Sequence, residues 1–265
     1  MDYGQPATLE FERRPDGVLE VWLARPDKHN AFNEAVIDEL CAAFEVAGAD
    51  DAVRCVVLGG RGKSFSAGAD ISWMRASGDV GYADNLDGAL RMARMFQTIY
   101  ECPKPVLARV HGAALGGGTG LTAVVDIAYA AESAIFGFTE VRLGIVPAVI
   151  SPYVVDKLGA AKARALFLTG ERFDAREAER VGLVFRSVPD DALDGAIDGG
   201  VQAVLKGGPA ALGIAKNLSQ RLAAIDDIGH TAELIAHVRG SDEAREGLTA
   251  FLEKRKAAWC EECDD

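Results

Sequence analysis

The chain has few of the residues on which several classes of protein depend. Of its 265 residues, five are cysteine, four are histidine and three are tryptophan. So sparse and odd a set of cysteines excludes a disulfide framework. Only Cys260 and Cys263 have the spacing of a metal or redox motif, and no second such pair or paired histidines accompany them. We therefore expect no metal site in this chain.

Long apolar runs and an excess of positive charge are also lacking. No run of about 18 uncharged apolar residues occurs, so we expect no transmembrane helix. Residues 1–6 lack the basic and apolar stretches of a secretory signal, which makes a cytoplasmic protein the default expectation. The net charge of −12 argues against nucleic-acid binding through bulk charge. A polyanionic ligand would need local cations.

Apolar residues make up 49% of the chain, which is enough for one sizeable core. The patterns of residues 8–13, 18–24, 53–58 and 105–110 predict strands. Helices are predicted after Asn33, which can cap one, and over residues 87–101 and 121–125. We interpret the polar residues 74–88 as a loop, either a mobile flank of the site or ordinary surface. Alternating strands and helices indicate the α/β class, and the pattern beyond residue 195 is helical.

The glycine-rich residues 112–120 join a predicted strand to a predicted helix. Glycines at such a junction leave backbone N–H groups bare at the positive end of the helix dipole. That arrangement suits an anion or a developing oxyanion. Taken alone, such a run is also typical of a tight turn with close helix–strand packing. A second glycine-containing segment, residues 63–70, favours the site interpretation.

Five segments, in order along the chain, resemble the crotonase or enoyl-CoA hydratase/isomerase superfamily. Residues 66–70 resemble its first oxyanion loop, and residues 112–118 resemble its second. Residues 25–31 are similar to its N-terminal coenzyme A segment, and residues 136–144 to the segment with a catalytic glutamate. Residues 251–256 are similar to the C-terminal segment that reaches a neighbouring subunit's coenzyme.

The resemblance implies a fold and a set of partners. The fold is a spiral of ββα units over residues 1–195, followed by a helical trimerisation region over residues 196–265. The partner is an acyl-CoA thioester, with no nucleic acid and no membrane. No separate cofactor is implied, because coenzyme A is part of the substrate. The assembly implied is a homotrimer or a dimer of trimers.

The resemblance also implies roles for single residues. Glu140 is the acid/base, and the backbone N–H groups of Ala67 and Gly117 stabilise the charge on the thioester oxygen. We expect the apolar residues around Glu140 to raise its pKa. The residues implied in coenzyme A binding are Lys28, Ala31, Ala67, Gly68, Ala69, Asp70, Phe251 and Lys254.

Gly120 departs from the pattern, because typical hydratases have a second glutamate there. Several functions stay open: hydration by Glu140 alone, isomerisation, decarboxylation, or acyl-CoA binding without catalysis. Residues 72–74 and 147–152 resemble bacterial hydratases of carboxylated branched enoyl-CoAs, of which methylglutaconyl-CoA hydratases are nearest. Hydration is therefore favoured. The candidates for meeting a distal carboxylate are Arg75, Arg91, Arg94 and Arg142.

Overall fold

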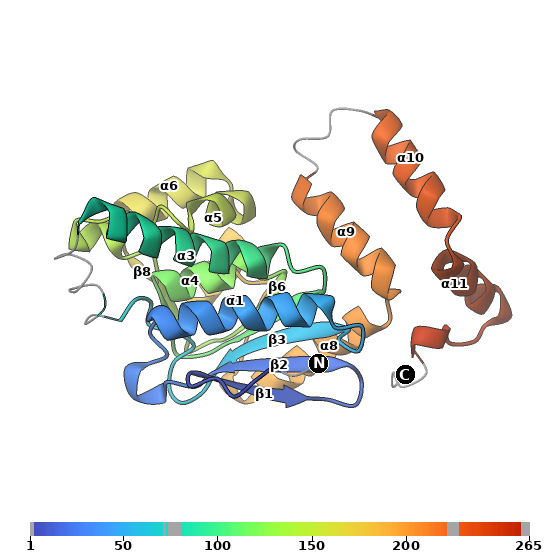
Figure 1. Cartoon of the computed structure of the whole chain (residues 1–265), viewed down its shortest axis with the longest axis horizontal. Coiled ribbons are helices and arrows are strands. Elements are labelled where there is room, and N and C mark those ends of the chain that lie inside the picture. Colours follow the sequence, from blue (N-terminus) through green and yellow to red (C-terminus); the bar gives the residue numbers. More distant parts are fainter. Residues whose placement is uncertain (1–2, 71–72, 74–80, 222–227, 261–265) are drawn as a thin grey trace.

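A six-stranded sheet forms the centre of the fold (Figure 1). The computed structural model describes residues 3–70, 73, 81–221 and 228–260. Strands β1 and β2 pair antiparallel, and the remaining neighbours in this sheet pair parallel. In sheet order, the strands are β1 (Leu9–Arg13), β2 (Val18–Leu23), β3 (Cys55–Gly60), β4 (Val106–Val110), β6 (Ile127–Ala131) and β9 (Arg186–Val188). A smaller sheet contains β5 (Ala113–Leu115), β7 (Ile135–Gly137) and β8 (Arg172–Asp174).

Strand β3 shows why the large sheet is covered on both faces. All six of its residues are buried, and successive side chains of a strand point to opposite faces. Val56 and Leu58 belong to the core cluster shared with α1 (Glu34–Ala49), α3 (Tyr82–Tyr100) and α4 (Gly117–Val124). Val57 belongs to a second cluster, shared with α8 (Leu193–Leu205). The α/β class predicted from the sequence is confirmed by this layering.

The other helices cover the second sheet or lead away from the core. They are α5 (Ser151–Leu158), α6 (Ala160–Thr169), α7 (Ala175–Val181), α9 (Pro209–Arg221), α10 (Ile228–Arg239) and α11 (Asp242–Glu253). Short 3₁₀ turns occur at η1 (Pro26–Lys28), η2 (Glu140–Leu143), η3 (Asp190–Ala192) and η5 (Ala258–Cys260). None of the helices in the described ranges is long and apolar enough to cross a membrane.

Two helix starts differ from the sequence predictions. The helix expected from Asp87 begins at Tyr82, because its buried C-terminal half, with Met95 and Phe96, anchors a helix whose first turns are exposed. Residues 74–80 of the predicted loop lie outside the described residues. The helix expected from Leu121 begins at Gly117, because burial of residues 118–124 outweighs the poor helix propensity of its glycines. The predicted cap is confirmed, since the Asn33 side chain accepts from the Val36 N–H.

The predicted domain boundary at residue 195 falls inside α8. Ile197 and Val201 on this helix pack on the sheet, so the sheet core continues to Leu205. From α9 onward the chain turns away, and Figure 1 shows α10 and α11 standing apart from the sheet. A trimerisation role for this region stays a prediction.

Arg54 ties the end of the described chain to the sheet. Its Nη1 donates to the Trp259 carbonyl at 2.9 Å, and its Nη2 donates to the carbonyls of Leu205 and Gly207 at 3.1 and 3.0 Å. Hydrogen bonds from a charged donor are each worth roughly 1.5–3 kcal/mol, and their loss leaves carbonyls without a partner.

We predict that Arg54→Met lowers the free energy of unfolding by about 2 kcal/mol, because it removes these bonds. Arg164→Met, at an exposed position on α6, is the control and should stay within about 0.5 kcal/mol of wild type. Denaturant unfolding followed by tryptophan fluorescence measures both. Equal stability of the two variants would show that the Arg54 contacts do not hold the C-terminal turn.

Candidate active site

A cavity of about 180 Å³ lies where the two predicted oxyanion loops meet the segment after β7. Its wall includes residues 67–69, Gly116 and Gly117, together with Glu140 and most of residues 143–150. The structure therefore brings together three separate parts of the sequence, which contribute Ala67, Gly68 and Ala69, then Gly117, and then Glu140. Glu140 is the one ionisable side chain in the described lining, and nearly all the rest is hydrocarbon or backbone.

The first loop is held on both sides by neighbouring chain. Single β-bridges pair Ser66 with Ala114 and Ala69 with Phe32. Across the second bridge, the Phe32 N–H donates to the Gly68 carbonyl at 2.7 Å and the Asp70 N–H donates to the Phe32 carbonyl at 2.8 Å. In such a parallel pairing, the N–H of the central residue points away from its partner strand. The Ala69 N–H has no acceptor among the described residues.

Gly117 supplies a second N–H without a partner. It is the first residue of α4, so its N–H lies beyond the reach of the helix's own carbonyls. The described part of the chain offers this N–H no other acceptor. It also lies at the positive end of the α4 dipole, which favours negative charge.

The prediction that Ala67 supplies a donor is wrong. Its N–H donates to the His29 carbonyl at 2.9 Å and is not free for a ligand. The reason is the two-sided pairing of the loop, which turns the Ala67 N–H toward residues 29–32 and leaves the Ala69 N–H unpaired. Sequence reasoning could not detect this pairing, because it joins residues 36 to 38 positions apart.

Two glycines with positive φ allow the loops and Glu140 to converge. At Gly68 (φ 87°), an added Cβ would lie 2.7 Å from the Leu115 carbonyl oxygen and 3.4 Å from the Gly117 nitrogen. At Gly116 (φ 52°), an added Cβ would lie 3.3 Å from Glu140 Oε1. Only glycine combines these backbone conformations with this close approach. Both loops therefore border the same space as the carboxyl group.

Glu140 begins the η2 turn after β7, and its carboxyl group is largely removed from water. Burial raises its pKa above the ordinary glutamate value, while a bond from its own backbone N–H acts in the opposite direction. The direction expected from the sequence is confirmed. Its Oε2 atom is buried and has no hydrogen-bond partner among the described residues. A buried oxygen without a partner is unusual, and here it is available to a proton, a water molecule or a substrate.

Gly120 does not line the cavity. It is buried in α4, where an added Cβ would lie 2.4 Å from Ile150 Cγ2 and 3.3 Å from Phe96 Cε1. The space that a side chain at position 120 would take is thus filled by Ile150, which does line the cavity. Sequence reasoning did not identify Ile150 as a site residue, since no local pattern links it to Gly120.

The N-terminal coenzyme A segment is joined to the first loop by Arg25, another residue that sequence reasoning missed. Its Nη2 pairs with Asp70 Oδ2 at 3.2 Å, and its Nη1 donates to the Ala31 carbonyl at 2.5 Å. Lys28 is exposed in the η1 turn between these contacts. Arg25 therefore connects Asp70 with the segment that contains Lys28 and Ala31. The role of these residues in coenzyme A binding stays a prediction.

The C-terminal segment lies elsewhere. Phe251 on α11 is 80% exposed, and Lys254 directly after it is exposed as well. Figure 1 shows α11 at the opposite side of the molecule from the segment that leads into α1, and this segment includes the η1 turn with Lys28. Within one chain, these two parts of the predicted coenzyme A site do not meet.

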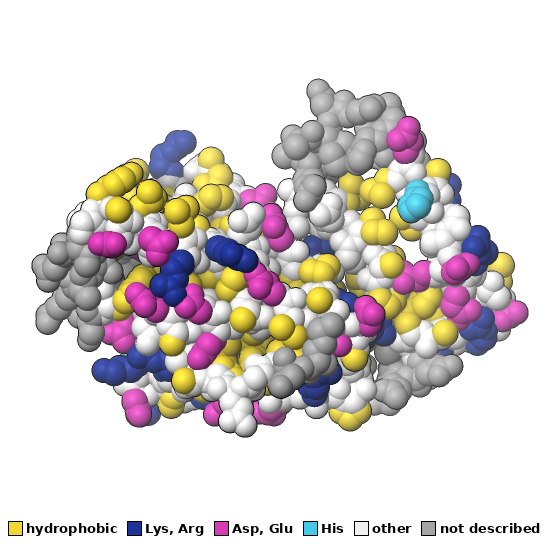
Figure 2. Space-filling view, in the orientation of Figure 1, with side chains coloured by type: hydrophobic (Ala, Val, Ile, Leu, Met, Phe, Trp, Pro, Cys, Tyr) yellow, Lys and Arg dark blue, Asp and Glu magenta, His cyan; other side chains and the backbone are white. Residues whose placement is uncertain are grey.

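None of the described arginines predicted to meet a distal carboxylate lines the cavity. Arg91 pairs with Asp38, and Arg94 pairs with Glu45 at 2.9 Å, both across the outer surface between α3 and α1. Figure 2 shows basic and acidic side chains interspersed on this surface. Arg142 is exposed and Arg75 lies outside the described residues.

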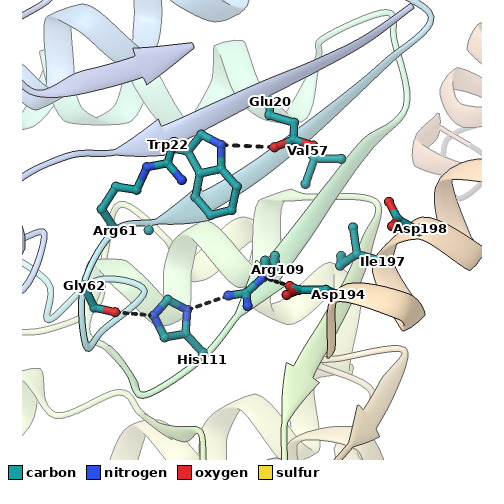
Figure 3. A pocket seen from close by; sticks show the side chains of 11 residues that line it. Glu20, Trp22, Val57, Arg61, Gly62, Arg109, His111, Asp194, Ile197 and Asp198 are labelled. Atoms are coloured by element: carbon teal, nitrogen blue, oxygen red, sulfur yellow. Dashed lines mark hydrogen bonds and ion pairs between the residues drawn. The ribbon is translucent and has the colours of Figure 1, made fainter. Parts of the chain in front are cut away.

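A second cavity, of about 530 Å³, lies on the α8 side of the sheet (Figure 3). Its cations already have acceptors or a ring beside them. Arg109 donates to Asp194 Oδ1 at 2.5 Å and lies 3.2 Å from His111 Nδ1, while the Arg61 guanidinium lies 4.2 Å from the Trp22 ring centre. These cations are therefore already engaged within the protein, and the cavity is poorly suited to binding a phosphate. No group of three or more metal-ligating side chains occurs among the described residues.

Comparison with known proteins gives the chain its family. The sequence profile described as enoyl-CoA hydratase/isomerase matches residues 13–262. A Rhizobium meliloti protein named "Probable enoyl-CoA hydratase" is 38% identical over 244 residues, which are 89% of this chain and 92% of that protein.

Solved structures agree with that match. The crystal structure of an enoyl-CoA hydratase from Shewanella pealeana matches with a TM-score of 0.91 and 40% identity, over 96% of this chain and 97% of that one. Pseudomonas aeruginosa AtuE matches with a TM-score of 0.91 and 36% identity, over 96% and 100% of the two chains. These structures confirm the fold class expected from the sequence. The chain, whose family profile spans nearly its whole length, belongs to the enoyl-CoA hydratase/isomerase family.

Proposed function

We propose that the protein adds water to the double bond of an enoyl-CoA thioester and catalyses the reverse reaction. One observation carries this proposal. A buried carboxyl group with a raised pKa shares an otherwise apolar cavity with two free backbone N–H donors from separate loops. An acid/base group beside an oxyanion site is the pairing that enolate chemistry needs.

In this scheme, the Ala69 and Gly117 N–H groups donate hydrogen bonds to the thioester oxygen. Water loses a proton to Glu140 as its oxygen bonds to the β-carbon, and the π electrons of the double bond move to the thioester oxygen as an enolate. The enolate then takes the proton from Glu140 at the α-carbon, which regenerates the carboxylate. Each donor is worth roughly 3–4 kcal/mol in comparable oxyanion holes.

The lining next to Glu140 is apolar, so the part of the acyl group that lies there should be hydrocarbon. Our finer proposal is a branched, carboxylated acyl group such as that of methylglutaconyl-CoA. It rests on the resemblance of residues 72–74 and 147–152 to hydratases of such substrates. Its distal carboxylate needs a cation from outside the described lining, and Arg75 is the residue to test.

Isomerisation is the second candidate, and the filled space at Gly120 favours it. Ile150 leaves no room there for a second carboxylate, so Glu140 acts alone. In an isomerase, Glu140 would remove a proton from the γ-carbon and return it to the α-carbon through the same enolate, with no water added.

A panel of enoyl-CoA thioesters, with and without a distal carboxylate, separates these functions. We expect mass spectrometry to show the gain of one water, fastest with a branched carboxylated substrate. Products of unchanged mass with a shifted double bond, seen by NMR, would establish isomerisation instead. Binding without any product would contradict both proposals.

Glu140→Gln should lower kcat by about 10²–10⁴-fold, because the amide cannot exchange the proton. The dissociation constant for the thioester should change little, since binding depends on other groups. Stopped-flow kinetics and calorimetry measure the two quantities. A variant that keeps most of the wild-type kcat would remove Glu140 from the mechanism.

The same variant should be more stable than wild type at neutral pH. Because the pKa of Glu140 is raised in the folded state, its contribution to stability is fully present below the unfolded pKa and is lost as pH rises through the folded pKa. Glutamine carries no such loss. The difference in Tm should therefore be small near pH 4 and should grow as pH rises toward 8. A constant difference across that range would contradict a buried, titrating carboxyl group.

We further propose that coenzyme A binds between two copies of the chain in a trimer or a dimer of trimers. The separation of Lys28 from α11 within one chain supports this arrangement. Truncation after Gly240 should break the assembly and weaken coenzyme A binding, as sedimentation and calorimetry would show. A fully active monomer would contradict the proposal.

Mixing subunits tests the shared site more sharply. Lys28→Ala chains and Phe251→Ala/Lys254→Ala chains should each bind coenzyme A weakly. After dissociation and reassembly together, a fraction of the interfaces should recover wild-type affinity, because they combine two intact surfaces. Chains carrying all three substitutions are the control and should recover none. A mixture that binds no more tightly than the two unmixed variants would place the whole site within one chain.

A further inference from the structure

Ile150 fills the space above Gly120 and also forms part of the cavity wall. Its side chain is 3% exposed, and its Cγ2 atom lies 2.4 Å from the position that a Cβ on residue 120 would take. That distance is shorter than any ordinary carbon contact, so Gly120 and Ile150 fit together only while residue 120 has no side chain.

Neither partner of this contact has room to retreat. Behind Gly120, the fully buried ring of Phe96 lies 3.3 Å from the same Cβ position. Ile150 caps the N-terminus of α5, where its carbonyl accepts from the Val154 N–H at 3.1 Å. The helix therefore fixes the main chain of Ile150. A larger residue 120 would push the Ile150 side chain toward the cavity that it lines.

We propose that Gly120 and Ile150 form an interlocked pair that sets the size of the acyl cavity beside Glu140, and that Ile150 is a specificity-determining residue for the acyl group. This inference rests on the proposed function, in which the cavity holds the acyl group of a coenzyme A thioester. It also gives Gly120 a role of its own. Because glycine has no side chain, it leaves room for Ile150, which forms an apolar wall where typical hydratases have a second glutamate.

Unfolding measurements test the interlock without any substrate. Gly120→Ala should lower Tm by roughly 5 °C, because it overpacks a buried contact. Ile150→Leu and Ile150→Val form an informative pair of second substitutions. Leucine lacks the Cγ2 methyl that faces residue 120 but keeps the carbon count, whereas valine keeps that methyl and loses only Cδ1.

The double variant Gly120→Ala/Ile150→Leu should therefore recover most of the lost Tm, and Gly120→Ala/Ile150→Val should recover little. Gly120→Ala/Val149→Ala is the matched control, because Val149 lines the same cavity without meeting residue 120, and it should recover nothing. Equal recovery by leucine, valine and the control would overturn the interlock.

Substrate profiles test the specificity role. Ile150→Ala removes three carbons from the wall, and one methylene in an apolar pocket changes kcat/KM by about 10–200-fold. The ratio of kcat/KM for trans-2-octenoyl-CoA to that for crotonyl-CoA should rise at least tenfold. In Gly120→Ala the ratio should fall. Val155→Ala, at an exposed position on α5 outside the cavity lining, should change it less than twofold.

The outcomes separate this inference from the proposed function. If Ile150→Ala does not fold, the smaller change Ile150→Val should move the ratio in the same direction. A wild type that hydrates enoyl-CoAs, with ratios unchanged in both Ile150 variants, would overturn the specificity role alone. A wild type that transforms no thioester would overturn the proposed function and with it this role, while the unfolding series would still decide whether the two residues interlock.

Discussion

The candidate site depends on the short extended segment around residues 66–70, which is paired on both sides. One side is joined to β5 through Ser66, and the other is joined to the entrance of α1 through Ala69. A free loop would sample many conformations and lose entropy on binding a ligand. The two bridges remove that freedom before any ligand arrives. The direction of the Ala69 N–H is therefore set by main-chain pairing and does not depend on any one side chain.

The net charge of the chain is unfavourable for an anionic ligand, but the charges next to the cavity are locally balanced. The chain carries a net charge of −12, yet the proposed ligand is a polyanion. Arg25 neutralises Asp70 at the junction of the two segments that flank the cavity, so that carboxylate does not face the ligand uncompensated. Among the described residues, the cavity lining contains a single carboxyl group, and burial shifts even this group toward its neutral form.

Sequence patterns could predict the features that depend on neighbouring residues and the motifs that members of the family share. The buried β3 strand, the Asn33 cap and the order of the site segments all follow from nearby residues, and the structure agrees with them. What escaped prediction depends on contacts between distant positions. The N–H of Ala69 is free, and that of Ala67 is not, because of the pairing with residues 29–32. The absence of a side chain at Gly120 is explained by the position of Ile150. Neither partner is marked by spacing or residue type.

The contacts of Arg54 have a consequence for the order in which the chain can finish folding. The bond to Trp259 joins residues 205 positions apart, so it cannot form until the segment that contains Trp259 has left the ribosome. The carbonyls of Leu205 and Gly207 reach the same guanidinium much earlier. Arg54 can thus bind the end of α8 first and the C-terminal turn last. Once both contacts have formed, the same guanidinium joins the two ends of the segment that contains α9, α10 and α11.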